Sequence, residues 1–318
     1  MHLLPMRYFT AVARHRSISG AARALYLTQQ TLSAHMAALE EELGCTLFLR
    51  RPTFRLTPEG ERFLDYCQRF LALDSAMRQT FADLAHQPAG PLRVGISQTR
   101  SAILMPGVAL RCREEVPGLE LRISEATNDR LLALLEEGEL DAVLGNLPRE
   151  TPELERKALY REEMVLVIPP TEPFSPLDPA LGPDALLDLA RDLPFIMNTT
   201  RDIAGRYGSQ ILAQHSIVPR TAAVSDSAET CLEMCRRGLG LYICPDLYPR
   251  HFRALAAELT LCPLGVTYSI DLAWRKELYV SSALRAFAEA CREETAGGTY
   301  GTTESIPGTS CLFPSPGI

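Results

Sequence analysis

The sequence lacks the short motifs by which many enzymes of this size are recognised. Its 318 residues contain no P-loop, no GxSxG, no HExxH and no GxGxxG after a first strand, and the six histidines stand far apart. Side chains distant in sequence can still meet and form a catalytic site. Without a motif, however, we expect a protein that is not an enzyme and that needs no cofactor.

Closely spaced cysteine pairs of the CxxC type are also missing. The nine cysteines are scattered and odd in number, which argues against a disulfide framework and against a structural zinc site. Cys231 and Cys235 are four residues apart and would share a helical face. They would meet, lie near a metal or simply be buried thiols, and we favour the last interpretation and predict no metal site.

Long hydrophobic runs are absent as well. No stretch approaches the roughly 18 apolar residues of a membrane helix, and the first residues, MHLLPMRYFT, do not form a continuous signal segment. We therefore expect a cytoplasmic protein. Because 46% of the residues are hydrophobic, the chain is expected to fold into two or three domains.

The net charge of −7 is unevenly distributed. Residues 1–62 contain eight arginines and five glutamates, a formal charge of +3, which leaves −10 for the remainder. A basic head on an acidic body is expected when only the head meets a polyphosphate.

Residues 1–60 have the pattern of three short helices followed by a small hairpin. MRYFTAVARHR has helical periodicity, Ser17 or Ser19 would cap a second helix, and Thr28 would cap a third, QQTLSAHMAALEEEL, which ends at Gly44. After it, CTLFLRRPTFRLT alternates across a turn as a two-stranded wing does.

A long helix is predicted from Pro58 to about Ala85. Its apolar residues, from Phe63 to Leu84, are too many for a solvent-exposed helix. Such a face would pack on the rest of the chain or on the same helix of a second copy. The sequence QPAG before Pro91 then marks a domain boundary.

Beyond this boundary, strand-like and helical runs alternate, which indicates a sheet covered by helices. LRVGIS, LELRIS, LDAVLG, MVLVIP, PFIMN, TAAVS and LGLYIC are the expected strands. Residues 295–318 are rich in Gly, Thr, Ser and Pro, and they are predicted to be a disordered tail.

The segment SISGAARALYLTQQTLSAHMAALEEELGCTLFLRRPTFRLTPEG resembles the winged helix-turn-helix of the LysR-type transcriptional regulators. LLALLEEGELDAVLG, RRGLGLYICPD and IDLAWRKELYVSSALRAFAEACRE are similar to the effector domain of that family. The resemblance covers about residues 1–294. It implies a DNA-binding domain at 1–60, a linker helix at 61–87 that forms dimers, and an effector-binding α/β domain at 91–294.

Polar side chains gather at the start of the third predicted helix, whose N-terminal end would enter a major groove. Amide and short polar side chains suit base edges, and arginines on the wing suit phosphates or a minor groove. The alternative is that this polar helix face is only exposed to solvent and contacts no DNA. The residues expected to contact DNA are Gln29, Gln30, Thr31, Ser33, His35, Arg50, Arg51 and Arg55.

The resemblance implies that the effector domain is like a periplasmic binding protein, with lobe I at 91–161 and 267–294 and lobe II at 162–266. Ligands in such sheets bind beyond the carboxyl ends of strands. Two arginines in these loops favour a small organic anion, although these polar residues are also suited to helix caps. The expected effector-binding residues are Ser97, Gln98, Thr99, Arg100, Thr127, Asn128, Asn146, Asn198, Thr199, Arg201 and Asp226.

The partners that the resemblance implies are operator DNA with an inverted repeat, a small-molecule effector, a second copy of the chain and RNA polymerase. Dimers of this family often assemble further into tetramers. A stand-alone solute-binding protein is the alternative for the C-terminal part alone, but it would leave the N-terminal head without a purpose.

Overall fold

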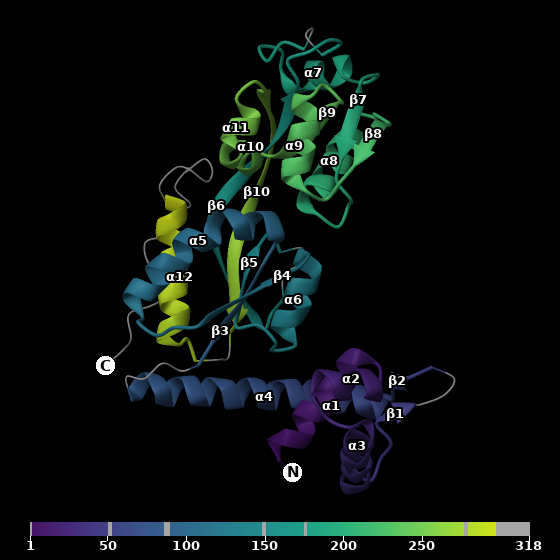
Figure 1. Cartoon of the computed structure of the whole chain (residues 1–318), viewed down its shortest axis with the longest axis vertical. Coiled ribbons are helices and arrows are strands. Elements are labelled where there is room, and N and C mark those ends of the chain that lie inside the picture. Colours follow the sequence, from purple (N-terminus) through teal and green to yellow (C-terminus); the bar gives the residue numbers. More distant parts are fainter. Residues whose placement is uncertain are drawn as a thin grey trace. The chain divides into compact units, whose positions relative to one another are not determined.

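The computed structural model describes residues 2–49, 53–85, 90–147, 151–174, 177–276 and 279–296. These residues form two compact units, and the second unit begins at Gly90 (Figure 1). Within the described residues, no helix combines the length and the apolar character that crossing a bilayer requires.

The first unit contains the three short helices, the wing and the long helix that the sequence predicts. The first helix begins at Leu3, earlier than its periodicity suggested, because Pro5 lies in the first turn, where a missing N–H removes no helical hydrogen bond. The elements are α1 (Leu3–His15), α2 (Ile18–Ala24), α3 (Gln29–Leu43), β1 (Phe48–Leu49), β2 (Arg55–Leu56) and α4 (Pro58–Leu84).

Side-chain caps fix where α2 and α3 begin. Ser17, and not Ser19, caps α2 by accepting a hydrogen bond from the backbone of Gly20. Thr28 caps α3 as predicted, and Gly44 ends it with a left-handed φ of 67°. The predicted turn between α2 and α3 is therefore bounded by defined helix ends.

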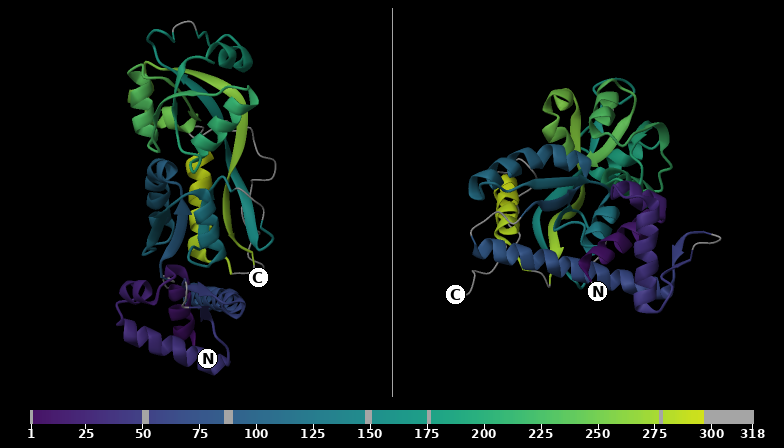
Figure 2. Two further views of the ribbon diagram at one scale, coloured as in Figure 1. Left: turned by 90° about the vertical axis from the view of Figure 1, so that its right-hand side faces the viewer. Right: turned by 60° about the horizontal axis from the view of Figure 1, so that its bottom comes forward.

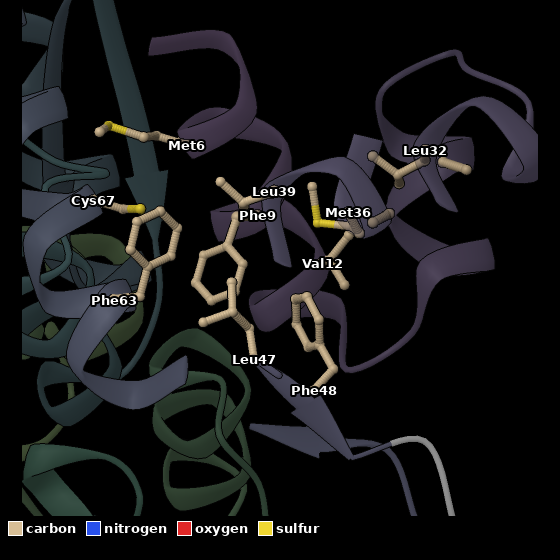
Figure 3. Packing of buried hydrophobic residues seen from close by; sticks show 12 residues of the cluster. Met6, Phe9, Val12, Leu32, Met36, Leu39, Leu47, Phe48, Phe63 and Cys67 are labelled. Carbon is tan, nitrogen blue, oxygen red and sulfur yellow. The ribbon is translucent and has the colours of Figure 1, made fainter. Parts of the chain in front are cut away.

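One hydrophobic core joins all the elements of this unit (Figure 3). Phe9 of α1 lies at its centre, with ring centroids 5.0 Å from Phe48 of the wing and 4.9 Å from Phe63 of α4. Ala21 and Ala22 are almost fully buried, so α2 can lie close to α1 and α3. This core holds α3 in a fixed orientation.

The second unit is built on one mixed sheet of eight strands, in the order β4-β3-β5-β10-β6-β9-β7-β8. β3 is parallel to β4 and β5, and β7 is parallel to β8 and β9. The strands are β3 (Leu92–Ile96), β4 (Leu121–Glu125), β5 (Ala142–Gly145), β6 (Leu154–Ile168), β7 (Pro194–Met197), β8 (Arg220–Val224), β9 (Leu241–Pro245) and β10 (Thr260–Arg275).

Two long antiparallel strands, β6 and β10, run through both halves of this sheet (Figures 1 and 2). The N-terminal part of β6 and the C-terminal part of β10 pair beside β5 in lobe I. Their other ends pair beside β9 in lobe II. The register of the pair is irregular between Pro263 and Thr267 and between Ile270 and Asp271.

Helices cover the sheet of each lobe. In lobe I, α5 and α12 pack against each other, and α6 packs on β3, β5 and β10. Helix α12 continues to Ala296, so residues 295 and 296 are helical and not part of a tail; residues 297–318 lie outside the described residues. The helices are α5 (Gln98–Glu115), α6 (Asn128–Glu136), α7 (Pro183–Leu189), α8 (Ile203–Gln214), α9 (Ala228–Arg236), α10 (Leu247–His251), α11 (Arg253–Ala256) and α12 (Ser282–Ala296).

Candidate DNA-binding surface and effector site

The N-terminal end of α3 presents polar side chains to solvent. Gln29, Gln30 and Thr31 are exposed at this end. Thr31 is tied to the helix cap, because its hydroxyl lies 2.8 Å from that of Thr28. The Ser19 hydroxyl on α2 donates to Oε1 of Gln29 at 2.9 Å. Two predicted DNA-contacting side chains are therefore already positioned by their neighbours.

Two other predicted residues of α3 are less accessible. Ser33 is half-buried, and the ring of half-buried His35 lies against Tyr8 of α1 with centroids 5.0 Å apart. The structure thus separates His35 from the three exposed side chains at the helix start.

The wing is anchored at its base to α3 and α4. Oε1 of Glu40 accepts hydrogen bonds from the backbone N–H groups of Leu47 and Phe48. At the start of α4, a Cβ on Gly60 would lie 2.2 Å from the carbonyl oxygen of Leu47, so only glycine allows this close approach. Arg55 on β2 is exposed, whereas Arg50 and Arg51 lie outside the described residues.

Helix α4 exposes a row of large apolar side chains at helical spacing. Each has 50% or more of its surface exposed within this chain, which is unusual for a stripe that spans most of a helix. The stripe consists of Tyr66, Phe70, Leu73, Met77, Phe81 and Leu84. Its polar neighbour Asp74 is buried and is bonded to Arg7 and Arg78.

In the second unit, Arg100 does not face a ligand as expected. Its Nη2 donates to both carboxylate oxygens of Glu162, at 2.9 and 2.7 Å, and its Nη1 donates to Ser97. Arg100 is 1% exposed and Glu162 is fully buried. An internal carboxylate therefore already neutralises the charge of Arg100, and the structure does not present this predicted effector residue as a free cation.

Two tyrosines complete this buried network. The hydroxyls of Tyr160 on β6 and Tyr268 on β10 donate to Glu162, at 3.0 and 2.5 Å, and burial raises the pKa of both tyrosines well above the usual range. The network thus fastens the first turn of α5 to the two strands that both lobes share. No local pattern signals this network, because Arg100 lies 62 residues before Glu162 and Tyr268 lies 106 residues after it.

Asn146, which follows β5, provides a direct connection between the lobes. Its Oδ1 accepts from Arg206 on α8 at 3.0 Å, and its Nδ2 donates to the carbonyl of Ser269. Tyr207, next to Arg206, stacks on Tyr268 with ring centroids 4.7 Å apart. Sequence reasoning found Asn146 at a strand end but missed Arg206, which lies inside a helix.

The predicted residues of lobe II form two short contacts. Asn198 is buried and donates to the carbonyl of Ser225 at 2.6 Å. Thr199 donates to Asp226 from both its backbone N–H, at 3.1 Å, and its hydroxyl, at 2.7 Å. The ends of β7 and β8 are thereby joined, while Arg201 remains exposed.

The remaining predicted effector residues belong to lobe I. Gln98 and Thr127 are exposed, Thr99 is half-buried, and Asn128 is buried with its Oδ1 close to Gly145. The structure therefore does not bring all the predicted residues into mutual contact. It does place them at the ends of strands and the starts of helices.

Asp202 is an acidic residue that the sequence reasoning did not select. It caps α8 by accepting a hydrogen bond from the backbone of Ile203 at 2.7 Å. Burial raises the pKa of its carboxyl, and the charge of nearby Asp226 adds to this effect, whereas the Ile203 bond and the charge of Arg100 oppose it.

The described cysteines are free thiols, and most are buried. Burial raises the pKa of Cys67 to about 12 and the pKa values of Cys112 and Cys231 to about 11. Burial also raises the pKa values of Cys235 and Cys244. Within the described residues, no three His, Cys, Asp or Glu side chains converge as a metal site.

Two family models match the chain, one on each side of residues 62–84, which form most of α4. The model described as "Bacterial regulatory helix-turn-helix protein, lysR family" matches residues 3–61. The model described as "LysR substrate binding domain" matches residues 85–296.

Individual proteins are similar to this chain over about half of its length or over most of it. A probable hydrogen peroxide-inducible genes activator of Mycobacterium xenopi is 39% identical over 175 residues, which are 54% of this chain and 92% of that protein. A full-length OxyR variant from Pseudomonas aeruginosa is similar in structure with a TM-score of 0.65 and 24% identity, over 92% of this chain and 95% of that one. Full-length CbnR complexed with its target DNA has a TM-score of 0.56 and 22% identity, over 92% and 100%.

Proposed function

The chain belongs to the LysR family of bacterial transcriptional regulators, and we propose which of its residues recognise DNA and which class of effector it senses. It is a DNA-binding regulator with an effector-binding domain, and proteins of this family oligomerise. Its place of action is then the cytoplasm, where operator DNA lies, and we assign it no catalytic step.

The exposed N-terminal end of α3 is the single observation that carries the DNA-binding proposal. Gln29 and Gln30 read base edges there, since amide side chains form hydrogen bonds with base atoms in the major groove. Arg55, together with Arg50 and Arg51, contacts phosphates or the minor groove and adds affinity more than sequence preference.

The exposed stripe of α4 explains how two such heads act together. Apolar side chains at this spacing would be covered by the same stripe of a second chain. A two-fold dimer presents two α3 helices, so the operator contains an inverted repeat with half-sites on one face of the duplex.

Selection of bound fragments from genomic DNA, at a stated salt concentration, tests this proposal. We expect an enriched inverted repeat for the native chain and at least tenfold weaker, less selective binding for Gln29→Ala and Gln30→Ala. Arg55→Ala should weaken binding to all sequences and reduce the dependence of affinity on salt.

Gln210→Ala and Arg113→Ala are matched controls, because they change the same residue types at exposed positions of the second unit. No enrichment, with the α3 variants behaving like the controls, would instead favour a protein that only binds a solute.

For the effector, we propose a small organic anion held by Arg206 and Arg201. Arg206 is half-buried, and its side-chain partner is the neutral amide of Asn146 across the lobes. No carboxylate among the described residues forms an ion pair with Arg206. The nearby acidic groups are otherwise engaged, since Asp202 caps α8 and Asp226 binds Thr199.

Calorimetry with a panel of organic acids and matched neutral amides tests the class of effector. We expect binding of at least one carboxylate, weakened about tenfold or more in Arg206→Gln and unchanged in Arg220→Gln, an exposed arginine on β8. Binding of neutral or cationic compounds only, with Arg206→Gln unaffected, would contradict the proposal.

Effector sensing is proposed to occur by binding and not by thiol oxidation, although relatives are named as probable hydrogen peroxide-inducible genes activators. A thiolate is the reactive form of cysteine. The raised pKa values of Cys112 and Cys231 keep these thiols protonated at neutral pH. After brief peroxide treatment of the folded protein, alkylation in denaturant should therefore label these two residues as fully as in the untreated chain.

The mechanism that we propose couples ligand to DNA through the lobes. An anion that replaces Asn146 as the partner of Arg206 would favour a different angle between the lobes, and hence a different spacing of the paired heads. The ligand acts only through its differential affinity for the two arrangements. The changed spacing would alter contact with RNA polymerase.

A further inference from the structure

We propose that Ser19 is a positioning residue, which orients Gln29 for reading a base without itself contacting DNA. The inference rests on the proposed role of α3 in DNA recognition and goes beyond it. The observation behind it is the hydrogen bond from the Ser19 hydroxyl to Oε1 of Gln29, 2.9 Å long, which joins α2 to the first residue of α3.

Ser19 has no evident part in the folding of α2. The helix is capped by Ser17, whose hydroxyl accepts from Gly20, and the side that packs on the core carries Ala21 and Ala22. Ser19 is exposed. Among the described residues, its side-chain hydrogen bond is the one with Gln29, so its hydroxyl holds that side chain.

The contact matters because a glutamine side chain is flexible. A free glutamine side chain at a helix start samples many rotamers, and it must lose that freedom when its amide meets a base. Ser19 restricts the side chain before DNA arrives. Because α2 and α3 pack against each other in one buried core that includes Ala22 and Leu32, the amide is held relative to the whole recognition helix.

The bond also determines which atoms face the groove. With Oε1 accepting from Ser19, the two N–H groups of Nε2 remain as donors. Acceptors on base edges in the major groove are N7 of the purines, O6 of guanine and O4 of thymine. Gln29 therefore presents donors to one of these atoms, and Ser19 increases the preference at that single base pair.

The test uses the full chain and the operator fragment selected by the native protein, with each base pair of one half-site substituted in turn. Gln29→Ala identifies the base pair that Gln29 reads. We expect Ser19→Ala to lower discrimination at that base pair by about three- to tenfold. Affinity for an unrelated duplex and the salt dependence should remain those of the native chain.

Three further variants separate positioning from other roles. Ser19→Thr keeps the hydroxyl and should restore native discrimination. The double variant Ser19→Ala/Gln29→Ala should match Gln29→Ala alone, since Ser19 acts through Gln29. Ser17→Ala removes the helix cap, and it should lower thermal stability and weaken binding to all sequences alike.

A uniform loss of affinity in Ser19→Ala, or a reduced salt slope, would show a direct phosphate contact and overturn the inference. Native discrimination in Ser19→Ala would overturn it too, while leaving the reading role of α3 intact if Gln29→Ala loses discrimination. If Gln29→Ala changes no base preference, both the inference and the proposed role of Gln29 fail.

Discussion

Arg100 and Glu162 form a two-pronged ion pair that is almost completely withdrawn from solvent, with nearest atoms 2.7 Å apart. The pair connects the first turn of α5 to β6, the strand that passes from one lobe to the other. A buried pair of this kind tolerates the loss of one partner poorly, because the remaining charge is left without a counter-charge.

We expect Glu162→Gln to destabilise the second unit by about 3–5 kcal/mol. The chain has a single tryptophan, and Trp274 is buried in β10, so its fluorescence during urea unfolding reports on this unit alone. Glu120→Gln, which breaks the exposed pair with Arg122, should cost less than about 1 kcal/mol. Equal effects of the two variants would show that Arg100 finds another partner.

Asp202 should make the second unit more stable as the pH falls. Burial raises the pKa of Asp202 in the folded state, so the folded form gains its proton at a higher pH than the unfolded form. The destabilisation is present in full above the folded pKa, and it is relieved as the pH falls through that value. Other carboxylates will oppose this trend in the native chain.

The variant Asp202→Asn isolates this effect, because asparagine also caps helices. It should raise the urea midpoint at pH 7.5, and this gain over the native chain should shrink at pH 4. A gain that is the same at both pH values would indicate a cause other than ionisation.

The apolar stripe on α4 predicts that two copies of the chain associate through this helix. Replacing Leu73, which is 59% exposed within one chain, by glutamate should weaken self-association by about 100-fold or more, since each copy would bury a charge. Sedimentation over a range of concentrations measures this change. Gln79→Glu, away from the stripe, should leave association unchanged; association that also survives in Leu73→Glu would place the dimer interface elsewhere.

Replacing either of two helical glycines of the first unit by alanine should change the stability of the protein differently. Gly60→Ala places a methyl group against the carbonyl of Leu47, at 2.2 Å, and we expect a loss of about 2 kcal/mol or more together with weaker DNA binding. Gly20→Ala meets only ordinary contacts, at 3.4 Å or more, and should be neutral or stabilising by up to about 1 kcal/mol. Thermal melts by circular dichroism compare the two variants.

Local signals predicted the first unit well. Thr28, Gly44 and the periodicity of α4 mark helix ends and helix faces, and such features depend on residues a few positions apart. The predicted strand MVLVIP, by contrast, covers only the C-terminal part of β6. Most side chains in the earlier half of β6 are only partly buried, so this half is polar, and neither alternation nor a continuous apolar run marks it.

The candidate effector site was predicted less well for a related reason. Strand ends can be located from sequence, and the polar loops after β5, β7 and β8 were found in this way. Whether the charge of Arg100 is already paired depends on Glu162, which is 62 residues away. No local pattern distinguishes an arginine that awaits a ligand from one that is already paired.

The order of the strands has a consequence for synthesis of the protein on the ribosome. The helices and the wing of the first unit are complete once α4 has emerged. The sheet of lobe I, by contrast, requires the C-terminal part of β10 between β5 and β6, and its outer layer requires α12. A nascent or truncated chain would therefore acquire its DNA-contacting helices long before its sensor is finished. Only after α12 has been translated can the sensor domain regulate the DNA-contacting helices.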